Sequence, residues 1–234
     1  MDEIEIIPAI MPKSFRDIKE KAESVKDQVS WIQIDVMNKT YTPSNTWPYS
    51  ETNDFANLFD EEGLPFWQDV SYEVDLMLSN PFVEASKWIE IGVERAIFHF
   101  ASSSDIIDIL QKTKEKYGDN RWFCVEIVLA VTTEDDLSKV KECLPYLDAI
   151  QVMGIYPVGV QGSDFKEKTY DTIKKLREFT DLPISIDGGV SCDNAIALVE
   201  AGANRLVSGS FIFNQDNPAI GVGELKNCIK TDLK

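Results

Sequence analysis

The sequence predicts an α/β fold: one (β/α)8 barrel, the TIM-barrel architecture, spanning residues 1–234. Short apolar segments alternate with amphipathic segments along nearly the whole chain, as in successive βα units around a parallel sheet. Eight such units fit a closed barrel at its compact limit. The competing architecture is a doubly wound open sheet, which is disfavoured because no GxGxxG motif follows the first apolar segment.

Each strand is expected where a short apolar run ends in polar or glycine residues. The expected strands are residues 4–10, 31–36, 72–78, 95–100, 122–131, 149–154, 183–188 and 205–209. Helices are expected at 14–25, 53–62, 82–91, 104–117, 133–143, 166–179, 192–201 and 222–229, several opening with an N-capping Ser, Thr or Asp. The irregular stretch 38–70 is long for a βα loop, which predicts an insertion after the second strand that forms a lid or an oligomer contact.

Composition and charge limit the partners of the protein. The net charge of −17 argues against nucleic acid and anionic membranes, because both are polyanions, but it allows a small phosphorylated ligand held by backbone amides. No apolar run approaches membrane-spanning length, and the start of the chain lacks a signal-peptide core, so a cytoplasmic location is expected. The cysteines, with no CxxC spacing, are expected to be reduced and mostly buried: Cys124, Cys143, Cys192 and Cys228.

Polar residues at the carboxyl ends of several predicted strands form the first candidate site. Alternation places Gln33, Asp35 and Met37 on one face of the second strand, and likewise Glu73, Asp75 and Met77 on the third. The same pattern pairs Gln151 with Met153 on the sixth strand, and the seventh strand ends at Asp187. If these faces point into the barrel mouth, three carboxylates meet three methionines in one cavity.

Taken singly, each of these residues has a simpler interpretation. A strand-end aspartate most often caps a helix or bonds a loop, and a strand methionine most often fills the core. Repetition of the spacing on several strands favours a shared site instead. Carboxylates gathered in a partly apolar pocket cannot all stay ionised without a cation, so they indicate either a bound metal or a shared proton.

Two glycine-containing loops form a second candidate site, for phosphate. The segment DGGVS follows the seventh predicted strand and SGSFIF follows the eighth, where barrels of this kind bind phosphate through backbone N–H groups. The candidate residues are Gly188, Gly189, Gly209 and Ser210. Plain βα turns are the alternative for either loop alone. The segment YPVGVQGSDF, with Gly159 and Gly162, is a candidate for a mobile loop that closes over the ligand.

These motifs together resemble the ribulose-phosphate 3-epimerase family. PAIMPKSF is similar to the opening strand of that family, QIDVMNKTYTP to its second-strand motif, and VDLML and FHF to its third and fourth. MGIYPVGVQGSDF is similar to its sixth-strand loop, SIDGGVSCDNA to its seventh and AGANRLVSGSFIF to its eighth. The resemblance covers most of the chain and implies a (β/α)8 barrel, with a homo-oligomer as the expected assembly.

The resemblance also implies roles for individual residues. Asp35 and Asp187 match the acid/base pair of the family, and its substrate-capping methionines correspond to Met37, Met77 and Met153. The family holds a metal with two histidines and two aspartates, but Gln33 and Asp75 stand at the histidine positions here. The ligand set Gln33, Asp35, Asp75 and Asp187 therefore contains only oxygen donors, which suits Mg²⁺ or Mn²⁺ better than Zn²⁺. The alternative is that no metal binds.

Two further positions bear on the resemblance. Ala9 replaces a serine of the family's first strand. His99 stands where the family also has a histidine that is not a metal ligand, and it is expected to be packed and hydrogen-bonded rather than catalytic.

Three functional hypotheses follow. The leading one is a sugar-phosphate 3-epimerase that interconverts ribulose 5-phosphate and xylulose 5-phosphate, or a close relative, by proton transfer through an enediolate. The second is an epimerase or lyase for another phosphosugar on the same barrel. The third is a non-catalytic homologue that binds a small phosphorylated sugar.

Overall fold

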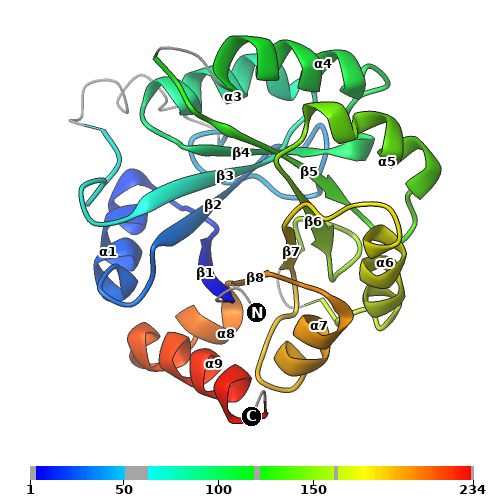
Figure 1. The fold of residues 1–234 in the computed structure, drawn as a ribbon. Coiled ribbons are helices and arrows are strands. Elements are labelled where there is room, and N and C mark those ends of the chain that lie inside the picture. The colour runs from blue at the N-terminus through cyan, green and yellow to red at the C-terminus, as the bar shows by residue number, and fades with distance from the viewer. Residues whose placement is uncertain (1–3, 51–62, 119–121, 161–162, 233–234) are drawn as a thin grey trace.

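The computed structural model describes residues 4–50, 63–118, 122–160 and 163–232. In these residues eight parallel strands close into a barrel in chain order, and helices surround it (Figure 1). The strands are β1 (Glu5–Ile10), β2 (Trp31–Met37), β3 (Ser71–Met77), β4 (Arg95–His99), β5 (Glu126–Val131), β6 (Ala149–Met153), β7 (Ile184–Asp187) and β8 (Arg205–Ser208). The predicted (β/α)8 barrel is thus confirmed.

The helices lie around the outside of the barrel (Figure 1). They are α1 (Phe15–Val25), α3 (Pro81–Glu90), α4 (Ile106–Thr113), α5 (Leu137–Cys143), α6 (Lys168–Arg177), α7 (Ala195–Ala201), α8 (Ser210–Phe213) and α9 (Pro218–Asp232). In α1 the buried residues Ile18, Ala22 and Val25 recur at helical spacing, and the Ser14 hydroxyl caps the helix by accepting from the Asp17 N–H. No helix in the described part of the chain is long and apolar enough to cross a membrane.

Several element boundaries differ from the predicted ones for local reasons. Strand β5 begins at Glu126 rather than at 122, and Trp122 itself is exposed. Helix α5 begins at Leu137 because Asp136, not a residue near 133, accepts from the Ser138 N–H at its N-terminus. The short helix α8 was not predicted, and the helix expected at 53–62 lies outside the described residues.

A layer of ion pairs fills the amino-terminal end of the barrel. The buried Arg95 guanidinium donates to Glu73 and to Glu126, and it stacks 3.8 Å from the ring centroid of Trp31. Arg205 pairs with Glu126 and with Glu5. Arg95 and Glu73 are both buried, and each offsets the charge of the other in this layer. Glu73, which shares a face of β3 with Asp75, therefore belongs to this layer and not to the mouth of the barrel.

The beginning of the segment between β2 and β3 supports the end of β2. The Thr46 hydroxyl donates to the Asp35 carbonyl and accepts from the Met37 N–H, both at 3.0 Å. The Thr46 N–H in turn donates to the Met37 carbonyl at 3.1 Å. Residues 51–62 of the expected insertion lie outside the described residues. The described part thus fixes the strand end that carries Asp35 and Met37.

The expectation of four reduced cysteines is wrong for two of them. Cys192 and Cys228 form a disulfide that ties the loop after β7 to α9. Packing of α7 against α9 brings their Cα atoms to 5.7 Å although they are 36 residues apart in the chain, so sequence spacing did not reveal the pair. Cys143 is free and buried, as expected, whereas Cys124 is free and exposed.

Loss of this disulfide should destabilise the barrel. Because a cross-link over 36 residues restricts the unfolded chain, Cys228→Ala should lower the free energy of unfolding by about 2–4 kcal/mol in urea denaturation under non-reducing conditions. The matched control is Cys124→Ala, at an exposed free cysteine, which should stay within about 0.5 kcal/mol of the parent. Equal midpoints for Cys228→Ala and the parent would contradict a stabilising role.

Candidate active site

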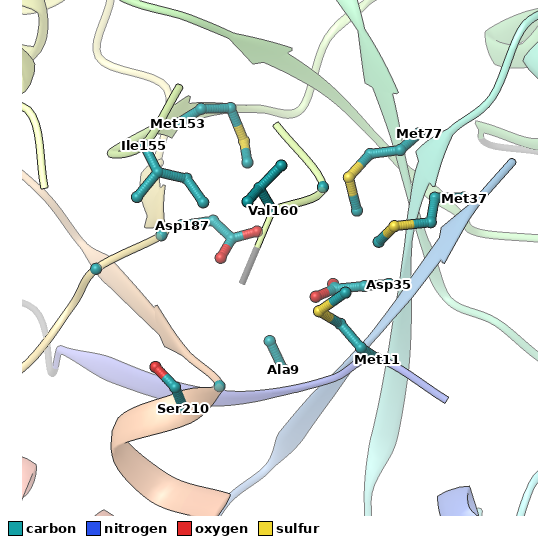
Figure 2. A pocket seen from close by; sticks show the side chains of 14 residues that line it. Ala9, Met11, Asp35, Met37, Met77, Met153, Ile155, Val160, Asp187 and Ser210 are labelled. Atoms are coloured by element: carbon teal, nitrogen blue, oxygen red, sulfur yellow. The ribbon is translucent and has the colours of Figure 1, made fainter. Parts of the chain in front are cut away.

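A cavity opens at the carboxyl ends of the strands, with about 560 Å³ of empty space counting the part open to solvent. Figure 2 shows Asp35 and Asp187 facing each other from opposite sides of this cavity, with Met37, Met77 and Met153 along one wall. The remaining lining residues are Ala9, Met11, Ile155, Gly159, Val160, Gly188, Gly189, Gly209 and Ser210. No lysine or arginine is among these residues. The cavity therefore combines an apolar wall, two carboxylates and glycine backbone.

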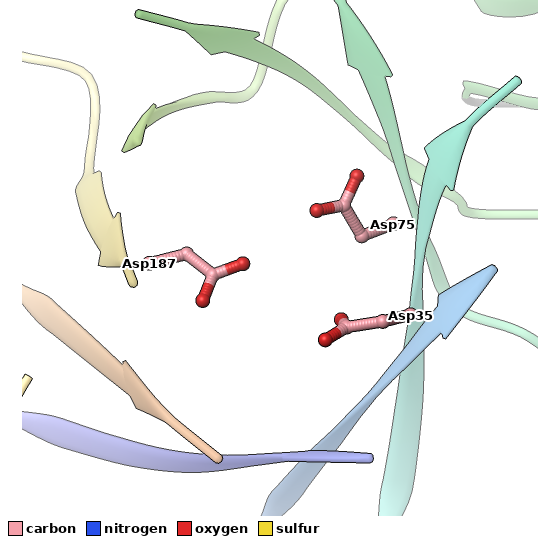
Figure 3. Close-up of side chains that lie close together, drawn as sticks. All are labelled: Asp35, Asp75 and Asp187. Atoms are coloured by element: carbon pink, nitrogen blue, oxygen red, sulfur yellow. The ribbon is translucent and has the colours of Figure 1, made fainter. Parts of the chain in front are cut away.

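Asp35, Asp75 and Asp187 point toward one another from β2, β3 and β7 (Figure 3). Each offers one carboxylate oxygen within 4.8 Å of the others. We call these three residues the carboxylate cluster. Asp75 is fully buried beneath the cavity, whereas Asp35 and Asp187 are each 8% exposed and line it. Asp35 and Asp187 can thus touch a ligand, while Asp75 sits behind them.

Two buried glutamine amides connect the carboxylate cluster. The Gln33 Nε2 donates to Asp35 Oδ1 at 2.7 Å and to Asp187 Oδ2 at 2.9 Å. From the other side of the barrel, the Gln151 Nε2 donates to Asp75 Oδ2 and to Asp187 Oδ2, both at 3.3 Å. Both amide oxygens, Gln33 Oε1 and Gln151 Oε1, are buried without a hydrogen-bond partner among the described residues.

His99 on β4 holds the far side of Asp75. Its Nε2 lies 2.7 Å from Asp75 Oδ1, and its ring packs 5.4 Å from the ring of Tyr41. His99 is itself buried and lines no part of the cavity. The expectation that it is packed and hydrogen-bonded is confirmed, and its contact with Asp75 orients that carboxylate toward the cluster.

Burial and mutual repulsion favour the neutral forms of the two cavity carboxyls. Burial raises the pKa of Asp187 to about 7, with a further contribution from the charge of Asp75. The pKa of Asp35 is raised well above its ordinary value by burial first and then by Asp187 and Asp75. Near neutral pH this environment favours a shared proton, so that one carboxyl group is protonated while another is ionised.

The loop after β6 covers part of the apolar wall. Gly159 has a φ of +74°, and a Cβ at this position would approach the Thr42 side chain to within 2.8 Å and the Met37 Sδ to within 3.3 Å. The adjoining Val158 is buried and Val160 lines the cavity. This loop thus packs across the mouth onto the segment after β2 and shields the methionine side of the cavity.

The loop after β7 brings backbone to the opposite side of the cavity. Gly188 and Gly189 have φ values of +103° and +70°, a conformation that side-chain-bearing residues rarely adopt. The Asn194 amide donates to the Gly189 carbonyl at 2.9 Å, which holds the turn in place. Across from them, Gly209 approaches the Ala9 carbonyl so closely that a Cβ would lie 3.0 Å from it. A side chain at Gly188 would also meet Ile155, so glycine permits the close packing of these loops at the edge of the cavity.

The structure gathers most of the predicted site residues around one cavity. Asp35, Asp187, the three methionines and the four phosphate candidates line it, and Gln33 and Asp75 lie directly behind the carboxylates. Gly162 lies outside the described residues. Gln151 was not predicted as a site residue, although its shared face with Met153 already placed it on the inward side of β6.

A closed (β/α)8 barrel with buried carboxylates at its mouth defines the class of barrel enzymes that act at the carboxyl ends of their strands. Residues 5–213 match the model of the ribulose-phosphate 3 epimerase family, and the chain belongs to that family. Curated relatives named ribulose-phosphate 3-epimerase include one from Mycobacterium tuberculosis (strain ATCC 25618 / H37Rv), 25% identical over 94% of this chain and 91% of its own. Another, from Chlamydia pneumoniae, is 28% identical over 91% of this chain and 89% of its own.

Solved structures share the fold. KGPDC from Streptococcus mutans superposes with a TM-score of 0.71 at 16% identity, over 98% of both chains. The 3-hexulose-6-phosphate synthase from Salmonella typhimurium has a TM-score of 0.70 at 14% identity, over 97% of this chain and 99% of its own. These likenesses establish the architecture.

The raised pKa values predict a pH-dependent stability in metal-free buffer. The pKa of Asp187 rises from 3.8 to about 7 on folding, so the native state binds more protons than the unfolded state between these values. The free energy of unfolding should therefore be highest at low pH within this window and fall as pH rises through about 7, by at most about 1.4 kcal/mol per pH unit for one proton. Urea denaturation in a chelator between pH 5 and 8 measures this slope.

Asp187→Asn should reduce that slope, because one of the two carboxyls whose pKa is raised no longer titrates. The matched control, Asp216→Asn, changes an exposed aspartate and should keep the parental slope. A parental slope in Asp187→Asn would contradict the assignment to the carboxylate cluster.

Proposed function

We propose that the protein is a sugar-phosphate 3-epimerase that interconverts D-ribulose 5-phosphate and D-xylulose 5-phosphate, in line with the names of its curated relatives. The observation that carries the proposal is the pair Asp35 and Asp187, which face each other across an apolar cavity and share the Gln33 amide. Inversion next to a carbonyl requires removal of a proton from one face of the carbon and delivery to the other. Two carboxyl groups on opposite walls meet that requirement.

In each direction one carboxyl starts ionised and the other protonated. The ionised carboxylate takes the C3 proton, and the C3–H electron pair forms the double bond of an enediolate as the carbonyl oxygen takes up negative charge. The protonated carboxyl then delivers its proton to the opposite face of C3, and the carbonyl forms again. The raised pKa values of Asp35 and Asp187 support this division, since burial and repulsion disfavour two ionised partners.

The methionine wall has a part in the same reaction. Met37, Met77 and Met153 present thioethers to the cavity, and these groups exclude water without offering a competing proton donor. The enediolate is thereby protected from protonation by solvent, and C3 exchanges protons with the two aspartates.

The residues around the cavity floor fit a hard divalent cation. The carboxylate cluster offers three oxygens within 4.8 Å of one another, and the buried Gln33 Oε1 has no partner among the described residues. Asp35, Asp75, Asp187 and Gln33 would hold Mg²⁺ or Mn²⁺ in preference to Zn²⁺, because all four donors are oxygens. When bound, the cation would offset the negative charge that develops on the substrate oxygens.

The substrate phosphate is assigned to the opposite side of the cavity. Gly188, Gly189, Gly209 and Ser210 line that side, and glycine permits close approach of backbone N–H groups to an anion. With no lysine or arginine among the described lining residues, the backbone and the Ser210 hydroxyl are the groups proposed to bind phosphate. Gly162, the homo-oligomer and the cytoplasmic location stay predictions.

The direct test is an assay of D-ribulose 5-phosphate turnover, with exchange of the C3 proton followed by NMR in D2O. Asp35→Asn and Asp187→Asn should each lower kcat by about 10²–10⁴-fold, because each removes one proton-transfer group. Chelation should suppress turnover, and Mg²⁺ or Mn²⁺ should restore it better than Zn²⁺.

Asp216→Asn serves again as the matched exposed control and should retain parental turnover. Undiminished turnover in folded Asp35→Asn or Asp187→Asn protein would overturn the two-aspartate mechanism. If the protein turns over a hexulose phosphate and not D-ribulose 5-phosphate, the proposed substrate is wrong and becomes a hexulose phosphate. Ligand binding without any C3 proton exchange in the folded parent would identify a non-catalytic sugar-phosphate binder.

A further inference from the structure

Gln151 shares a face of β6 with Met153, but it has no role in the proposed mechanism and is not in the proposed ligand set. It projects from β6 into the barrel, is fully buried, and does not reach the cavity surface. Its amide nitrogen lies 3.3 Å from oxygens of both Asp75 and Asp187. Gln33 approaches Asp187 and Asp35 in the same manner from β2. Two amides from different strands therefore end in the carboxylate cluster.

Each of these amides leaves its oxygen without a partner. Gln33 Oε1 and Gln151 Oε1 are both buried and accept no hydrogen bond from the described residues. Buried polar atoms in native proteins are almost always satisfied, so a pair of orphaned acceptors beside three carboxylates indicates a missing positive partner. A carboxamide has nearly the same shape after a half-turn about its last torsion, which exchanges the nitrogen and the oxygen.

The distances match the coordination shell of a small cation. Mg²⁺ and Mn²⁺ favour six oxygens at about 2.1 Å in an octahedron, which places neighbouring ligands about 3.0 Å apart. The amide nitrogens lie 2.7 to 3.3 Å from the carboxylate oxygens they bond. After a half-turn, the oxygen of each amide would stand where its nitrogen now stands. Its distance from the carboxylate oxygens would then equal the distance between neighbouring ligands of one ion.

We propose that Gln151 is a further ligand of the divalent cation through Oε1. The N–H groups of Gln151 and Gln33 bridge the carboxylates in the structure. In the loaded protein both amide oxygens face the ion, because an N–H group directed at a cation is repelled. The cation comes from the proposed function, on which this inference rests.

This assignment explains why a glutamine stands on β6. A neutral oxygen donor adds a ligand without adding charge to a site that already holds three carboxylates. It also biases the site further toward hard cations, since no nitrogen or sulfur donor is introduced. Gln151 is thus proposed to contribute to the choice of metal.

The test is isothermal titration calorimetry of the full chain with Mn²⁺ or Zn²⁺ alone, without sugar. Gln151→Met keeps the length of the side chain but replaces the hard donor, and it should weaken Mn²⁺ binding by at least tenfold. Gln151→His puts a nitrogen donor at the same reach and should shift the ratio of Zn²⁺ to Mn²⁺ affinity toward zinc by at least tenfold. Thermal unfolding by circular dichroism shows that each variant is folded.

Gln111→Met, the same exchange at an exposed position on α4, is the matched control and should bind Mn²⁺ like the parent. Binding by Gln151→Met within twofold of the parent would overturn the proposal. So would weakened binding in Gln151→Met with an unchanged metal ratio in Gln151→His, because a residue that only positions the carboxylates alters affinity without altering preference.

The epimerase assay separates this inference from the proposed function. If the parent protein turns over the sugar phosphate in chelator and binds no Mn²⁺, the proposed epimerase activity is retained. The cation site and the ligand role of Gln151 are then refuted. A parent that binds Mn²⁺ through Gln151 but moves no C3 proton keeps the ligand role and refutes the epimerase.

Discussion

Three carboxyl groups buried within 4.8 Å of one another repel when ionised, and the rest of the site is arranged around that repulsion. Gln33, Gln151 and His99 each place a ring or amide nitrogen against the cluster. Burial, and after it the same repulsion, raises the pKa values of Asp35 and Asp187, which favours a proton on one carboxyl while the other is ionised. The repulsion within the site and the proposed proton transfer therefore arise from the same carboxyl groups.

The barrel keeps these groups together against their repulsion. Strands β2, β3 and β7 are ordered members of a closed sheet, so Asp35, Asp75 and Asp187 cannot move apart without breaking backbone hydrogen bonds. At the amino-terminal end, Arg95 pairs with the buried Glu73, and Arg95 and Arg205 both pair with Glu126. One end of the barrel thus has paired charges for stability, while the other keeps charges of one sign available to a ligand or a cation.

Local sequence patterns predicted most of the fold. Alternating apolar and amphipathic segments identified all eight strands, because a parallel barrel buries each strand on both faces and covers it with a helix. Boundaries were less predictable: the start of β5 at Glu126 and of α5 at Leu137 depend on capping and exposure that alternating patterns do not record. The spacing of Asp35 to Met37 and of Asp75 to Met77 pointed to inward faces because side chains two apart share a face of a strand.

The sequence by itself determined the barrel, the inward faces of β2 and β3, and the glycine loops after β7 and β8, since each follows from short-range periodicity and backbone freedom. The tertiary structure decided what meets across the barrel. Only closure brings Gln151 of β6 onto Asp75 and Asp187, and only the packing of α7 on α9 joins Cys192 to Cys228. These contacts join residues far apart in the chain, and no local pattern encodes their distance in space.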